Sequence, residues 1–296
     1  MKPLFFGARM RYIQHMTIVR AAMIGDVVGE PGLEVLEARL PALAKEVDFI
    51  TVNGENAADG FGITEEGLRR IIAAGADIVT SGNHVWEKRD FWPVLDSEER
   101  VIRPANYPPA SPGVGWARIE KANHRWVVVN LQGREFMSDI DCPFRCFDQI
   151  LDNMAGKASD YHQMVLSDGA PLPGAYPIIL IDFHAESSRE KEALAYYVDG
   201  RASLIAGTHT HVQTADERIL PKGSAYITDL GMTGITNSVI GMDPKICMER
   251  VRKQVLYRME IAGAPADGMT TAKAELQGII AEFDADTGKA VSIRRI

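Results

Sequence analysis

The chain has 296 residues, of which 46% are hydrophobic and 24% are charged. Its 32 Lys and Arg are outnumbered by 40 Asp and Glu, and the net charge of −8 argues against the clustered basic surface that duplex DNA requires. No apolar run approaches the roughly 18 residues of a membrane span, and basic residues interrupt positions 1–17, where a secretory signal would lie. We therefore expect a globular protein that neither crosses a membrane nor binds duplex DNA.

The N-terminal part alternates short apolar runs with helical periodicity. Strands are predicted at residues 18–24, 49–52 and 78–80, and helices at residues 31–45 and 65–74 between them. Thr64 is the expected N-cap of the second helix. Strands that alternate with helices at this spacing indicate parallel βαβ units, whose functional groups gather beyond the carboxyl ends of the strands.

The remaining elements follow a less regular order. A hairpin is predicted at residues 116–120 and 126–131, a helix at 144–154, and a surface insertion rich in Pro and Gly at 156–176. Alternation then resumes, with strands at 178–183, 203–206 and 226–228, a helix at 188–198, and antiparallel strands at 255–261 and 274–283. We expect one domain over residues 18–296, preceded by an extension at residues 1–17.

The three cysteines, Cys142, Cys146 and Cys247, are too few for a disulfide framework, which favours a reducing cytoplasm. The spacing of Cys142 and Cys146 is compatible with a thiolate metal site. No second thiol pair accompanies them, however, and Pro143 lies between. We expect Cys142 and Cys146 to have a structural or incidental role and the protein to be cytoplasmic.

Polar residues follow the ends of several predicted strands. They are Asp26, Glu55 with Asn56, Asn83 with His84, His184, and His209 with His211. Each one alone is more often a helix cap, a turn residue or a core imidazole. Their shared position favours a single site, and carboxylates, carboxamides and imidazoles suit manganese, iron or zinc, whereas structural zinc more often recruits thiolates.

The pair His209 and His211 is the strongest of these local signals. In an extended segment, residues i and i+2 point to the same side. We therefore expect both imidazoles to reach one site.

Read in order, the motifs around these residues resemble those of the calcineurin-like metallophosphoesterases and, more narrowly, their YmdB-like branch. The matching motifs are Gly25-Asp26, Asn53-Gly54-Glu55-Asn56, Ser81-Gly82-Asn83-His84, Asp182-Phe183-His184-Ala185-Glu186 and Gly207-Thr208-His209-Thr210-His211-Val212-Gln213-Thr214. The resemblance extends from about residue 18 to residue 296. It implies a layered α/β fold with mixed sheets flanked by helices.

The resemblance also implies two divalent ions, with iron or manganese favoured and zinc compatible. The implied first site is Asp26, Glu55 and His211 with help from Asn56, and the second is Glu55, Asn83, His184 and His209. Glu55 would bridge the two ions. The general superfamily opens with Asp-x-His, but Val28 stands where that histidine would be, and Glu55 replaces the usual second Asp.

The activity implied by the resemblance is hydrolysis of small phosphodiesters, with 2',3'-cyclic nucleotides as the favoured class. We expect a hydroxide that bridges the two ions to attack phosphorus, and His84 to protonate the leaving alkoxide as general acid. Two alternatives stay open. One is a metal-dependent amidohydrolase, and the other is a metal-containing regulatory or RNA-associated binding protein with vestigial turnover. Self-association into a homo-oligomer is compatible with the acidic, mixed surface.

Overall fold

The computed structural model describes residues 17–155, 164–167, 176–263 and 273–296, with the side chains of 164–167 excluded. Most of the predicted extension at 1–17 and most of the predicted insertion at 156–176 therefore lie outside the described residues. The helices are α1 (Gly29–Leu43), α2 (Glu65–Ala74), the 3₁₀ helix η1 (Arg89–Phe91), α3 (Trp92–Ser97), α4 (Pro143–Met154), α5 (Ser188–Val198) and α6 (Pro244–Lys253). None of these described helices is long and apolar enough to cross a bilayer.

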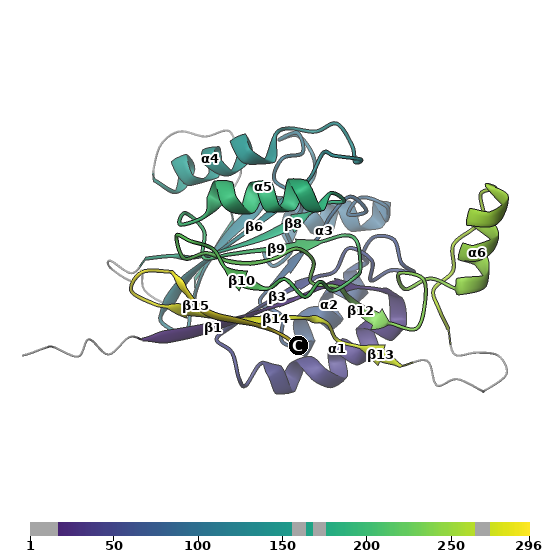
Figure 1. Ribbon diagram of the computed structural model, residues 1–296, viewed down its shortest axis with the longest axis horizontal. Helices are drawn as coiled ribbons and strands as arrows, with labels where there is room; N and C mark the ends of the chain where they lie inside the picture. The colour runs from purple at the N-terminus through teal and green to yellow at the C-terminus, as the bar shows by residue number, and fades with distance from the viewer. Residues whose placement is uncertain (1–16, 156–163, 168–175, 264–272) are drawn as a thin grey trace, which may run out of the picture.

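Two mixed β-sheets stack face to face at the centre of the molecule (Figure 1). The first has the order β15 (Ala290–Arg295), β14 (Gly278–Asp284), β1 (Ile18–Ile24), β3 (Phe49–Asn53) and β4 (Ile78–Thr80). The second has the order β10 (Arg218–Ile219), β11 (Ala225–Ile227), β9 (Leu204–Thr208), β8 (Ile178–His184), β6 (His124–Gln132), β5 (Trp116–Lys121) and β7 (Met164–Ser167). A small third sheet joins β13 (Ala274–Glu275), β12 (Met232–Ile235) and β2 (Asp26–Val27).

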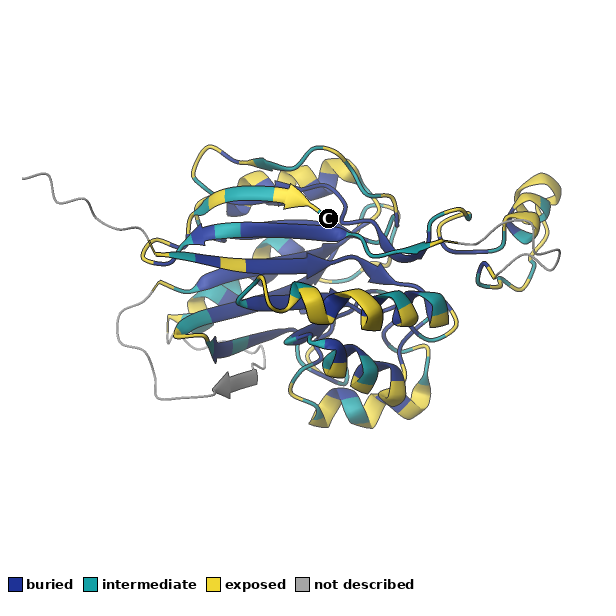
Figure 2. Ribbon diagram, turned by 90° about the horizontal axis from the view of Figure 1, so that it is seen from below, coloured by how far each residue is buried: buried dark blue, intermediate teal, exposed yellow. Residues whose placement is uncertain are grey.

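Alternation along the strands explains this stacking. In β1, Ala21 and Met23 face the core between the two sheets, whereas Ala22 and Ile24 face the helices on the outside. The period of two is that of a strand whose two faces are both covered. Figure 2 shows the central strands mostly buried, with the exposed residues on the outer sides of the helices.

Helices cover both outer faces and complete four layers. Leu36 of α1 and Ile71 of α2 pack on the first sheet, and Phe147 of α4 and Leu194 of α5 pack on the second. Thr64 caps α2, as predicted, because its side chain accepts a hydrogen bond from Gly67 N at 3.1 Å. The predicted layered α/β fold is thereby confirmed.

Of the two antiparallel strand segments predicted near the C-terminus, the first was wrong and the second is present as two strands, β13 and β14. Residues 255–260 form no strand. They follow helix α6, which projects from the body (Figure 1), and Leu256 among them is 86% exposed, so no burial favours a strand there. Ile261 makes only an isolated bridge with Met242. The predicted strand at 274–283 is divided at Gln277, whose side chain accepts from Met232 N while its carbonyl accepts from Gly25 N. The chain thus moves from the small sheet to the first sheet at this point.

The Trp126→Ala variant is expected to lose about 3–5 kcal/mol of unfolding free energy. Trp126 is fully buried between the sheets and stacks on Phe49 of the opposite sheet, with ring centroids 4.8 Å apart. Its removal leaves a cavity that two rigid sheets cannot close. Chemical denaturation measures the loss, and Phe136→Ala, at a residue 86% exposed, is the control expected to stay within about 0.5 kcal/mol of the parent. A loss below about 1 kcal/mol for Trp126→Ala would contradict this packing.

Candidate metal centre

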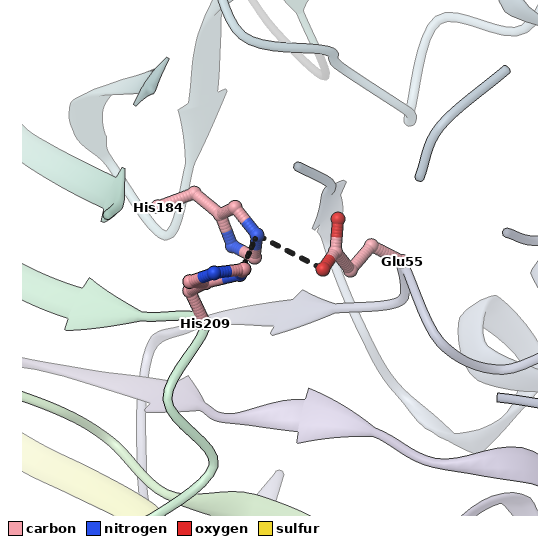
Figure 3. A group of neighbouring side chains, drawn as sticks. All are labelled: Glu55, His184 and His209. Carbon is pink, nitrogen blue, oxygen red and sulfur yellow. Dashed lines mark hydrogen bonds and ion pairs between the residues drawn. The ribbon is translucent and has the colours of Figure 1, made fainter. Parts of the chain in front are cut away.

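The carboxyl ends of the parallel strands in both sheets meet at one end of the sandwich. Glu55 follows β3, Asn83 follows β4, His184 is the last residue of β8, and His209 follows β9. These residues come from both sheets, so the site lies at the end of the sandwich that the two sheets share. Figure 3 shows Glu55, His184 and His209 pointing toward one another from three separate segments.

The first group of side chains surrounds His184. Its Nε2 lies 2.9 Å from Glu55 Oε1, 2.9 Å from Asn83 Oδ1 and 3.0 Å from His209 Nδ1. One ligand atom from each of Glu55, His184 and His209 lies within 4.8 Å of the others. Atoms that share a cation at roughly 2.1 Å lie about 3 Å from one another, which is the spacing seen here.

The second group lies around His211. His211 Nε2 is 3.3 Å from Asn56 Oδ1 and 3.8 Å from Asp26 Oδ1, and His211 Nδ1 is 2.9 Å from the carbonyl oxygen of Ile240. A backbone carbonyl at one ring nitrogen fixes the orientation of a histidine and leaves the other nitrogen to face a cation. Asp26 also lies 3.9 Å from His184 Nδ1, so the two groups are neighbours.

Two carboxylate oxygen atoms in these groups lack a hydrogen-bond donor from the protein and are suited to binding a cation. Asp26 Oδ1 and Glu55 Oε1 are buried and have no hydrogen-bond donor of suitable geometry, although imidazole nitrogens lie near both. A buried carboxylate oxygen without a donor is costly. A divalent cation would satisfy both oxygens, and the oxygen and imidazole donor set suits manganese, iron or zinc.

The pKa values show how strongly these groups interact. Burial would raise the pKa of Glu55, but the adjacent His184 outweighs it and lowers that pKa to about 2. Burial would lower the pKa of His184, but the charge of the adjacent Glu55 carboxylate outweighs it and raises that pKa to about 9. Burial, together with the charges of Glu55 and Asp229, raises the pKa of Asp26 to about 6 against the opposing imidazoles. Burial and His184 lower the pKa of His209 to about 3.

His209 and His211 do not lie on one extended segment, so the i, i+2 argument for both imidazoles reaching one site does not apply to them. His209 has φ 95° and His211 has φ 63°, so both lie in the left-handed region rather than in a strand. The chain turns directly after β9. The His209 ring therefore joins His184 and Glu55, whereas the His211 ring joins Asp26 and Asn56.

A buried hydrogen-bond network lies behind His184, and sequence reasoning missed it. His184 Nδ1 lies 2.9 Å from Thr208 Oγ1, which donates to Asp182 Oδ1 at 2.7 Å. The other oxygen of Asp182 accepts from Asn53 Nδ2 at 3.0 Å and from the Thr80 hydroxyl. Asp182 and Thr208 stand inside the matched motifs, but only the three-dimensional structure joins them, because they come from different strands.

His84 lies at the edge of the site rather than inside either group. Its backbone N donates to Glu55 Oε2 at 3.2 Å, and its ring packs edge-on against Phe61, with centroids 5.1 Å apart. Its Nδ1 lies 3.3 Å from Glu87 Oε1, and its side chain is 25% exposed. The ring is thus anchored beside the Glu55 carboxylate while remaining open to solvent.

The Gly82→Ala variant is expected to weaken metal binding, because a Cβ at Gly82 would clash with Glu55 Oε2 and with the His184 ring. One of these side chains must move, and a displaced ligand costs affinity. Equilibrium dialysis against Mn²⁺ measures the effect, for which we expect at least the roughly 10-fold loss typical of a disturbed ligand shell. Gly67→Ala on α2 is the matched control, since its Cβ would make only ordinary contacts of 3.4 Å and beyond. Equal Mn²⁺ affinity in both variants would contradict the expected crowding.

The chain is similar to known proteins over nearly its whole length. A family model described as YmdB-like protein matches residues 22–296. The chain is 41% identical over 280 residues to a Bacillus subtilis protein named 2',3'-cyclic-nucleotide 2'-phosphodiesterase, with coverage of 94% of this chain and 96% of that protein.

Two crystal structures share the fold. A hypothetical protein from Thermus thermophilus is 36% identical with a TM-score of 0.80, covering 94% of this chain and 98% of that one. A protein described as a novel phosphatase from Mycoplasma pneumoniae is 29% identical with a TM-score of 0.79, covering 95% of this chain and 93% of that one. The chain therefore belongs to the family of YmdB-like proteins.

Proposed function

We propose that this chain is a metal-dependent phosphodiesterase with two divalent cations that hydrolyses 2',3'-cyclic nucleotides. The observation that carries the proposal is the pair of buried oxygens, Asp26 Oδ1 and Glu55 Oε1, each facing imidazoles and lacking a hydrogen-bond donor. The name of the Bacillus subtilis relative supports the substrate class, because that protein is 41% identical across nearly the whole chain.

Seven side chains would hold the cations. One set is Glu55, Asn83, His184 and His209, and the other is Asp26, Asn56 and His211. The family resemblance implies that Glu55 would contribute to both sets. When bound, the cations would lower the pKa of a water molecule and neutralise charge on the phosphoryl oxygens. Against two carboxylates, two divalent cations leave a formal balance of about +2, which attracts a phosphodiester anion to a protein of net charge −8.

The chain itself supplies the proton for the leaving group. A water molecule adds its oxygen to phosphorus and loses its protons to solvent, while the bond from phosphorus to the ribose O2' breaks. His84 gives the proton on Nε2 to that O2' and is reprotonated from solvent after the product leaves. Glu87, 3.3 Å from His84 Nδ1, keeps the ring oriented with Nε2 away from Glu87. The product is a nucleoside 3'-phosphate. A general acid placed in this way contributes on the order of 10²–10⁴ in rate.

A panel of substrates tests the proposal. Protein supplied with Mn²⁺, Fe²⁺ or Zn²⁺ is incubated with 2',3'-cyclic AMP, 3',5'-cyclic AMP, p-nitrophenyl phosphate and a cyclic amide. We expect 3'-AMP from the first substrate as the fastest reaction. Faster hydrolysis of the amide would favour the amidohydrolase alternative, and tight binding of the nucleotide without turnover would favour a regulatory binding protein.

A further inference from the structure

One buried ion pair lies next to the metal-facing residues but belongs to neither group. Lys191 of α5 and Asp229, which follows β11, are joined with Nζ and Oδ2 2.7 Å apart, and their side chains are 1% and 0% exposed. Burying two charges is expensive, and a pair of apolar residues often gives equal or greater stability. Stability alone is therefore a weak reason for this pair.

Asp229 holds the residue that lies between the two histidines. Its Oδ2 accepts from Thr210 Oγ1 at 2.7 Å and from Thr210 N at 3.2 Å, in addition to the Lys191 ammonium. Its Oδ1 accepts from Gly231 N at 2.9 Å. The Asp229 carboxylate thus holds Thr210 with two hydrogen bonds. It is itself held by the Lys191 ammonium and by Gly231 N.

Thr210 is held in a strained stretch of backbone. His209 and His211, on either side, both have positive φ values, of 95° and 63°. Non-glycine residues in such conformations cost energy and persist only where their surroundings hold them. This local shape sends the His209 ring toward His184 and the His211 ring toward Asn56.

The Lys191 side chain reaches Asp229 across β9, and a glycine in β9 leaves space for that side chain. At Gly207 a Cβ would lie 2.8 Å from Lys191 Cδ and would also clash with the carbonyl of Thr228. Gly207 therefore keeps open the path by which a helix on the outer face of the second sheet supports the loop after β9. No motif joins Lys191 to Asp229, which are 38 residues apart, so the sequence alone gives no sign of the pair.

We propose that Lys191 and Asp229 are positioning residues that set the placement of His209 and His211, and so the relation between the two cation sites. They act through Thr210 and touch neither substrate nor cation. The inference rests on the proposed function insofar as the two histidines bind metal.

The test compares two identical substitutions. Thr210→Val removes the hydroxyl that donates to Asp229, and Thr228→Val removes a hydroxyl that donates instead to Asp216 Oδ2 at 2.6 Å. We expect Thr210→Val to bind Mn²⁺ about 10- to 100-fold more weakly, as for other outer-shell partners of metal ligands. It should also exchange the amide hydrogens of residues 209–211 faster in protein without added metal. Thr228→Val should bind and exchange as the parent does.

A second, charge-neutral variant removes the pair itself. Lys191→Met with Asp229→Leu should fold, because apolar residues of similar size replace a buried ion pair, and should show the same weakened Mn²⁺ binding. Parent-like binding and exchange in both Thr210→Val and the double variant would overturn the inference. Mn²⁺ binding by the parent without hydrolysis of any cyclic nucleotide would overturn the proposed substrate and leave the positioning role standing. A parent that binds neither Mn²⁺ nor Zn²⁺ would overturn both.

Discussion

Glu55→Gln is expected to remove metal from the His184 group and to abolish turnover. Glu55 Oε1 lies 2.9 Å from His184 Nε2, and the fully buried carboxylate supplies the negative charge around which the group is arranged. The amide keeps the shape but not the charge. We expect a loss of Mn²⁺ affinity larger than the roughly 10–100-fold that outer-shell partners contribute, and product formation at the level of protein-free controls.

The control for this variant is another buried glutamate. Glu120 on β5 is 6% exposed and pairs in register with Arg125, at the start of β6, whereas the site lies near the end of β6. Glu120→Gln should leave Mn²⁺ affinity and turnover close to those of the parent. If Glu55→Gln retained parent-like metal content and rate, Glu55 could not be a ligand.

His84→Ala is expected to keep its metal and to lose about 10²–10⁴ in kcat on 2',3'-cyclic AMP. The His84 side chain belongs to neither group of predicted ligands, and only its backbone N bonds Glu55. A general acid matters less when the leaving group needs no proton. The loss should therefore shrink for a p-nitrophenyl phosphodiester, which releases a more acidic alcohol.

Metal analysis and steady-state kinetics on both substrates separate this role from a structural one. His124→Ala, at the first residue of β6, is the matched control and should match the parent on both substrates. An equal loss on the two substrates, or a loss of metal from His84→Ala, would assign His84 a role other than proton donation.

The sequence predicts the strands of this fold well, because their pattern is local. Apolar runs at β1, β3 and β8 are bounded by polar loops, and most residues of each run are buried. Helix α6 carries no such pattern. It projects from the body with Val251 71% exposed (Figure 1), so tertiary packing does not shape its sequence.

The candidate site likewise has a part that the sequence predicts and a part that it does not. The residues that the motifs name do converge, since strand ends bring Glu55, Asn83 and His184 together. The family resemblance implies that His209 and His211 serve different groups, but the left-handed backbone at both residues that separates their rings does not follow from their spacing. The supports behind them depend on contacts between distant segments, as with Lys191 and Asp229.

The proposed activity depends most on two cations held by side chains from separate loops. Anomalous X-ray diffraction from crystals of this protein equilibrated with Mn²⁺ tests that directly. We predict two peaks, one among Glu55, Asn83, His184 and His209 and the other among Asp26, Asn56 and His211. No peak in this region, or a single peak away from these side chains, would contradict the two-cation centre.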